Sequence, residues 1–253
     1  MSQLDNFKEF VFRWTYGHAD SIRAMVLNDQ DSLVPIKDFF YYEGNDFLLK
    51  SLKPNKVTLL HDYIYENIYV ETSYALNKTF YEILPDIYEI LNLYNADYAL
   101  KEKYRGDNYP HYLMKKLEIS VFDKLTNEVF TLLYQDREFL RGFNLHAATY
   151  TKGLSLQQYP KFLKRDGVFI RNERWCTWLR KGLFFRDKGR CAVCTSDLTG
   201  LFSTGHKLAI DHIIPLALGG NNDPTNLQIL CSSCNGKKGG GNIHTSFNVP
   251  VYW

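Results

Sequence analysis

Hydrophobic residues recur at helical spacing along the first two thirds of the chain. Apolar positions three or four residues apart form a stripe down one face of a helix, as in helices that pack on a core. The stripe is clearest at Phe7, Phe10, Val11 and Trp14, at Ile22, Met25 and Val26, and at Val121, Leu125, Val129, Leu132 and Leu133. Residues 1–168 are therefore predicted to form a mainly α-helical region.

Polar residues and prolines indicate where some of these helices begin and end. Asp20 and Ser21 are typical capping residues and predict a helix start. The tyrosine-rich segment 59–93 predicts two or more helices with a break near Pro85, because proline disrupts a helix interior. The tyrosines are interpreted as residues at the edge of the core, with a partner surface as the alternative.

The pattern changes after about residue 160, where basic residues and glycine interrupt the apolar stripe. Residues 172–185 predict one further helix. A strand is then expected to end at Asp211 and His212, since Pro215 follows, and residues 225–230 predict a second extended segment. A last helix should begin near Cys231. The chain is thus predicted to be α+β, with a helical region over 1–168 and a small domain over 169–253.

Charge separates the same two regions. The net charge is +2, but residues 1–169 carry 20 Lys and Arg against 23 Asp and Glu, and residues 170–253 carry 10 against 5. A basic C-terminal end is expected if that end meets a polyanion such as nucleic acid. No apolar run approaches the ~18 residues that span a membrane. The N-terminus lacks the layout of a secretory signal, so a cytoplasmic location is expected.

All five cysteines lie in the last third of the chain. Cys191 and Cys194 form one Cys-x-x-Cys pair, and Cys231 and Cys234 form the other. Two such pairs supply the four thiolates of a structural zinc site, whereas a secreted disulfide framework would spread its cysteines along the chain. The fifth, Cys176, is expected to be a small buried residue.

The segment between the cysteine pairs carries residue types suited to phosphodiester hydrolysis. A neutral His212 can act as a general base for water. Asp211 points to the opposite face of an extended strand and can hold a divalent cation there. A hard cation such as Mg²⁺ prefers oxygen ligands, so a carboxylate and an amide oxygen suit it.

Together these residues resemble the HNH endonucleases of the ββα-metal type, in the subgroup with four zinc cysteines. The resemblance rests on both cysteine pairs, on Asp211-His212-Ile213-x-Pro215, on Gly219-Gly220, on Asn226 and on Cys231-x-x-Cys234-Asn235-x-x-Lys238. It implies that Asn235 is the second oxygen ligand of a catalytic Mg²⁺ or Mn²⁺, and that Asn226 fixes the loop that orients the base. Many members of the family have histidine where this chain has Asn235. The resemblance covers about a fifth of the chain.

The resemblance implies that the substrate is nucleic acid, and it favours DNA over RNA. Arg186, Arg190, Lys237 and Lys238 are candidate phosphate contacts, with solvated surface cations as the alternative. The leading hypothesis is a metal-dependent endonuclease. It would serve as the effector of a bacterial defence or restriction system, for example in antiviral defence. The alternatives are a zinc module that binds nucleic acid without cutting it, or a subunit of a larger complex whose helical region docks a protein partner.

Overall fold

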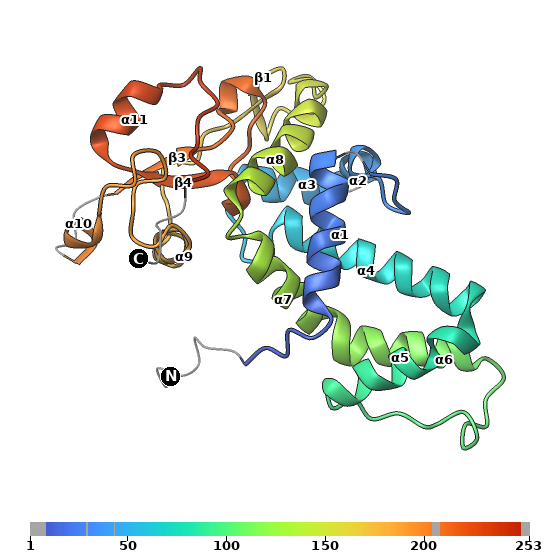
Figure 1. Ribbon diagram of the computed structural model, residues 1–253. Helices are drawn as coiled ribbons and strands as arrows, with labels where there is room; N and C mark the ends of the chain where they lie inside the picture. Colours follow the sequence, from blue (N-terminus) through green and yellow to red (C-terminus); the bar gives the residue numbers. More distant parts are fainter. Residues whose placement is uncertain (1–8, 29, 43, 204–207, 249–253) are drawn as a thin grey trace.

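The computed structural model describes residues 9–28, 30–42, 44–203 and 208–248. A helical region and a smaller region with short strands lie side by side (Figure 1). The helical N-terminal region and the predicted strand, strand, helix order near the C-terminus are both present, so the α+β class is confirmed.

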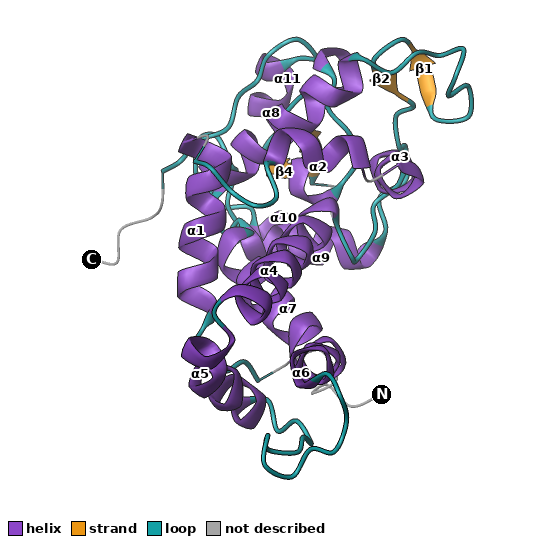
Figure 2. Ribbon diagram, turned by 90° about the vertical axis from the view of Figure 1, so that its right-hand side faces the viewer, coloured by secondary structure: helices purple, strands orange, loops and turns teal. Residues whose placement is uncertain are grey.

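Helices make up the N-terminal region. They are α1 (Thr15–Asn28), α2 (Ile36–Tyr42), α3 (Gly44–Leu52), α4 (Leu59–Lys78), α5 (Phe80–Leu93), α6 (Tyr109–Leu117), the π-helical turn η2 (Glu118–Phe122), α7 (Asp123–Leu133) and α8 (Arg137–Lys152). α1 packs on α7 and α8, and α4 packs on α7. α5 and α6 lie at the end of the molecule farthest from α11 and the small strands (Figures 1 and 2).

Two predicted helix boundaries were wrong. Asp20 and Ser21 do not start a helix but lie on the exposed face of α1, where polar side chains stay solvated. The break in segment 59–93 falls at Thr79, whereas Pro85 lies inside α5. Thr79 ends α4 because its backbone leaves the helical conformation, with φ −126° and ψ 35°.

The C-terminal region combines short strands with short helices. Its elements are β1 (Leu163–Arg165), β2 (Val168–Phe169), α9 (Thr177–Arg186), α10 (Thr199–Ser203), β3 (Ala209–His212), the 3₁₀ turns η3 (Leu216–Leu218) and η4 (Pro224–Asn226), β4 (Leu227–Leu230) and α11 (Ser232–Lys238). β1 and β2 form an antiparallel hairpin, as do β3 and β4. Cys176 was expected to be buried, but it precedes α9 and is exposed.

The described residues form a hydrophobic core that is divided into two clusters. The larger one fills the helical region around Tyr63, Phe40 and Phe143, and the smaller one lies between α9, β4 and the first cysteine pair. Ile213 and Ile214, which directly follow β3, are fully buried in the larger cluster. The chain after the predicted boundary at 168/169 therefore shares a core with the helical region.

The helices of the described residues include none that is long and apolar enough to cross a membrane.

Candidate active site and metal centre

The four paired cysteines converge in space. Their Sγ atoms all lie within 4.8 Å of one another, and Cys194 Sγ is 3.8 Å from Cys231 Sγ. Zinc–sulfur bonds of about 2.3 Å in a tetrahedron put the sulfurs about 3.8 Å apart. The number, type and spacing of these donors therefore fit a structural zinc ion.

The backbone around the cysteines explains this convergence. Ala192, between the first two cysteines, donates its N–H to Ile229 O at 2.9 Å and so ties the first pair to β4. Cys231 caps α11, and its Sγ accepts the N–H of Cys234 at 3.4 Å. A metal held by both pairs would join the start of α11 to the turn after α9.

The strand pair places the two polar residues of the motif at the end of β3. Asp211 lies opposite Gln228 and His212 lies opposite Leu227 in the antiparallel register. α11 packs against both strands. The sequence of strand, strand and helix thus forms one unit around Asp211 and His212.

His212 is almost fully buried, with 5% of its surface exposed. Its Nε2 lies 3.1 Å from Asn222 Oδ1, and the edge of Trp175 lies against its ring. Burial disfavours the charged imidazolium and lowers the pKa of His212 to about 4. The ring is therefore neutral near pH 7, as a general base must be.

Asp211 is held by two side chains from neighbouring elements. Its Oδ2 accepts from Lys238 Nζ at 2.8 Å and from Gln228 Nε2 at 3.1 Å. Among the described residues, no hydrogen bond falls on Oδ1. A carboxylate oxygen thus stays available for a cation, although Lys238 already offsets part of the charge.

Lys238 does not have the environment expected of a phosphate contact. Its side chain is 1% exposed, and its ammonium also donates to His212 O at 2.6 Å. Lys237, its neighbour on α11, is exposed. The two lysines therefore differ in environment. Lys238 binds the end of β3 through Asp211 and His212 O, and Lys237 faces solvent.

Asn226 is fully buried, and the hydrogen bonds that its side chain forms with the described residues all go to the backbone of its own loop. Its Oδ1 accepts from Ile214 N at 2.8 Å, and its Nδ2 donates to Ile214 O and Asn221 O, both at 2.9 Å. Gly220 lies so close that a Cβ there would clash with Ile214 O. These contacts hold the loop after β3 in place.

One cleft of about 550 Å³ brings the predicted working residues together. Asp211, His212 and Asn235 all line it, and Asn235 is exposed at its position on α11. Two oxygen-bearing side chains beside a neutral histidine are a donor set that suits Mg²⁺ or Mn²⁺.

Sequence reasoning missed the basic wall of this cleft. Lys164 and Arg165 on β1 and Arg171 after β2 line it and are exposed. The positive charge of Arg171 also contributes to the low pKa of His212. Their signal in the sequence was the cluster of basic residues near the predicted domain boundary, which was interpreted only as a break in the apolar pattern.

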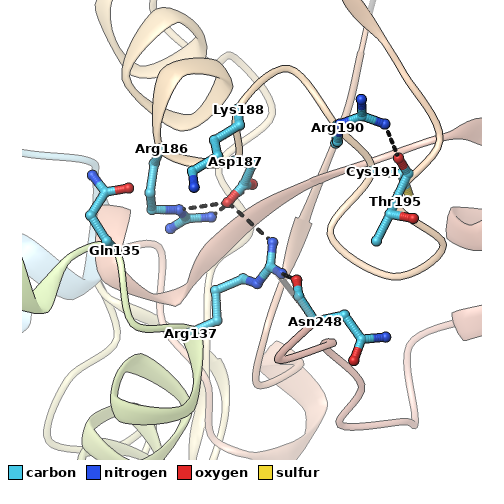
Figure 3. A pocket seen from close by; sticks show the side chains of 9 residues that line it. All are labelled: Gln135, Arg137, Arg186, Asp187, Lys188, Arg190, Cys191, Thr195 and Asn248. Carbon is cyan, nitrogen blue, oxygen red and sulfur yellow. Dashed lines mark hydrogen bonds and ion pairs between the residues drawn. The ribbon is translucent and has the colours of Figure 1, made fainter. Parts of the chain in front are cut away.

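The other two candidate phosphate contacts lie around a second, smaller pocket of about 250 Å³ (Figure 3). Arg186 was expected to be at the surface, but its side chain is 1% exposed and donates twice to Asp187, at 2.8 and 3.0 Å. Its guanidinium lies 5.0 Å from the ring of Tyr134, on the helical region. Arg186 therefore joins the two regions, because its guanidinium bonds to Asp187 and also lies over the ring of Tyr134. Arg190 is exposed, with a hydrogen bond to Thr195 O.

Residues 191–241 match the HNH endonuclease family. Neither a curated protein nor a solved structure matches the chain. The matched segment spans both cysteine pairs, the strand pair and all of α11. This match supports a nuclease or another metal-binding function that acts on nucleic acid. The C-terminal part of this chain is therefore an HNH endonuclease domain, with four cysteines placed to bind a metal ion.

Proposed function

We propose that this protein is a metal-dependent endonuclease that hydrolyses phosphodiester bonds, with His212 as the general base. The observation that carries the proposal is the shared cleft, in which a neutral buried histidine lies beside Asp211 and Asn235. The imidazole takes a proton from water as the water oxygen attacks phosphorus, and the bond to the leaving oxygen breaks.

Asp211 and Asn235 would hold Mg²⁺ or Mn²⁺. When bound, this cation supplies positive charge to the phosphate and to the leaving oxygen. The wall of the cleft carries three basic residues, Lys164, Arg165 and Arg171, which would attract the sugar–phosphate backbone. This attraction depends on charge rather than on base sequence. The zinc ion has a separate and structural task in this proposal.

DNA comes first among the substrates because of the family resemblance alone. An effector role in a defence or restriction system, a cytoplasmic location and a protein partner of the helical region are hypotheses from the sequence. A pull-down with the full chain would test the partner.

Cleavage assays with plasmid DNA and with RNA test the proposed activity directly. Zinc-loaded protein is incubated with Mg²⁺, with Mn²⁺ or without an added divalent cation. His212→Ala should lower the cleavage rate at least about 100-fold, because a general base contributes roughly 10²- to 10⁴-fold. His111→Ala, an exposed histidine on α6 at the far end of the molecule, is the matched control and should cut like the wild type.

Zinc content should be the same in both variants and the wild type, and both variants should remain folded at the assay temperature. Cleavage that survives in His212→Ala would show that the base is another residue.

Binding without cleavage is the second candidate function. The ion pair between Lys238 and Asp211 favours it, because a buried ammonium competes with a divalent cation for the carboxylate. In the same experiment this function would appear as a gel shift with both substrates and no cleavage under any metal condition.

A further inference from the structure

Asn222 connects the histidine of the cleft to the helical region. It is fully buried in the loop between β3 and β4. Its Oδ1 accepts from Asn172 N at 3.2 Å and lies 3.1 Å from His212 Nε2. No other described side chain forms a hydrogen bond with the His212 ring.

The surroundings of Asn222 determine which way its amide faces. Nδ2 lies 3.2, 3.0 and 2.9 Å from the carbonyl oxygens of Ser51, Leu52 and Ile170. Carbonyl oxygens only accept hydrogen bonds, so the reversed amide would place an oxygen against three oxygens. The amide nitrogen must therefore face the carbonyls, and the amide oxygen must face His212.

This orientation decides the tautomer of His212. An amide oxygen accepts but cannot donate, so a hydrogen bond to it requires a proton on Nε2. A neutral ring with its proton on Nε2 keeps its lone pair on Nδ1. The nitrogen that is left to accept a proton from water is then Nδ1.

Two helices of the N-terminal region hold this part of the loop. Ser51 and Leu52 are the last residues of α3, where carbonyls lack partners within the helix, and Ser51 O also accepts Asn222 N at 2.9 Å. The next residue, Asp223, accepts the N–H of Leu59, the first residue of α4, at 3.0 Å. The C-terminal end of one helix and the N-terminal end of the next thus fix two consecutive loop residues.

We propose that Asn222 is a positioning residue for cleavage, which selects the Nε2–H tautomer of His212 and is itself placed by the C-terminal end of α3. The helical region is then part of the catalytic apparatus, although it lies outside the segment that matches the nuclease family. This inference rests on the proposed function, in which His212 is the base.

Variants at two neighbouring buried asparagines separate positioning from general stability. Asn222→Ala removes the partner of His212. Asn221→Ala removes a fully buried amide from the adjacent position, whose Oδ1 accepts the N–H of Asp223 rather than bonding to His212. Asn222→Ala should lower kcat about 10- to 100-fold while KM changes less than about threefold, as when an outer partner of a functional histidine is lost. Asn221→Ala should keep kcat within about threefold of the wild type.

The tautomer itself is read by NMR, without any cleavage. The full chain is labelled with ¹⁵N-histidine and loaded with zinc, and the His212 signals are assigned by their loss in His212→Ala. Long-range ¹H–¹⁵N correlations should show a proton on Nε2 in the wild type and in Asn221→Ala. In Asn222→Ala the two tautomers should mix.

A wild-type ring protonated on Nδ1 would overturn the inference, and this result does not depend on how any variant folds. Unchanged kcat and tautomer in a folded Asn222→Ala would overturn it as well. A wild type that cuts no nucleic acid would contradict the proposed function instead, because the tautomer measurement stands apart from activity.

Discussion

Lys237 and Lys238 show how much one position along a short helix changes the role of the same residue type. Both lie on α11, yet Lys237 is exposed and Lys238 is buried against Asp211 and His212 O. A buried charge without its partner costs free energy, so Lys238 and Asp211 depend on each other. Lys237 has no such constraint.

Replacing each lysine by methionine tests this difference. Lys238→Met should lower the free energy of unfolding by about 2–3 kcal/mol, because Asp211 then lacks its cation and is only partly solvated. Lys237→Met should stay within about 0.5 kcal/mol of the wild type, as for most surface substitutions. Urea denaturation of the zinc-loaded proteins measures both. Equal losses in the two variants would contradict the assigned role of Lys238.

Residues with a chemical signature could be recognised from the sequence, and residues defined by tertiary contacts could not. The four cysteines were predicted together because their spacing reflects the geometry of a metal, and they do converge. The importance of Asn222 depends on carbonyls of α3, about 170 residues earlier in the chain, which no local pattern encodes. Arg186 looked like a surface cation because the sequence does not show that Asp187 and Tyr134 enclose it.

The short helix α11 needs external support. It has 7 residues, whereas an isolated helix in water needs about 12–15 to be even marginally stable. Cys231 and Cys234 anchor its first turn, and the helix carries Asn235 into the cleft. A metal at the cysteines would therefore determine where Asn235 lies.

Cysteine substitutions test this dependence, with the fifth cysteine as a matched control. Cys234→Ser should lose most of the bound zinc and be destabilised by on the order of 5 kcal/mol, because metal binding contributes directly to folding. The exposed Cys176→Ser should keep wild-type zinc content and stability. Metal analysis and the fluorescence of Trp175 and Trp178, which pack on the smaller core cluster, measure the two effects. Full zinc content in Cys234→Ser would show that the four-cysteine site is assigned wrongly.

The presence of helices was predicted more accurately than the residues at which they begin and end. Apolar spacing correctly indicated a helical N-terminal region, because one buried face suffices to produce that pattern. The break at Thr79 was missed since it is a change of backbone conformation at a single residue, and proline inside α5 gave a stronger but misleading signal. The β1–β2 hairpin was also missed, because strands of two or three residues are too short to show alternation.

On the scale of the whole molecule, a buried acid joins the two regions. Asp223 is fully buried, accepts Leu59 N from α4 and binds Thr225 within its own loop. Burial raises the pKa of Asp223 to about 6. The ionised form is therefore less stable in the folded protein than in the unfolded chain.

This raised pKa predicts a pH dependence of stability. A group whose pKa is higher in the folded state contributes stability that is complete below its unfolded pKa, near 4, and is lost as the pH rises through about 6. The free energy of unfolding of the wild type, relative to Asp223→Asn, should thus fall by up to about 3 kcal/mol between pH 4 and pH 7. Urea denaturation across this range measures the difference.

Asp197→Asn supplies the control. Hydrogen bonds from Thr199 lower the pKa of Asp197, so its contribution is lost only as the pH falls below about 4. The difference between this variant and the wild type should stay flat from pH 4 to pH 7. If the difference in free energy of unfolding between Asp223→Asn and the wild type were also constant over this range, burial would not destabilise the ionised form of Asp223.

The hydrogen bonds that join Asn222 and Asp223 to α3 and α4 link residues 164 to 171 positions apart. During synthesis, α3 and α4 leave the ribosome long before the loop that they bind, and long-range contacts of this kind form late in folding. A nascent chain with a finished helical region would therefore still lack an ordered cleft. The endonuclease activity that we propose would therefore be absent until the loop and α11 have left the ribosome.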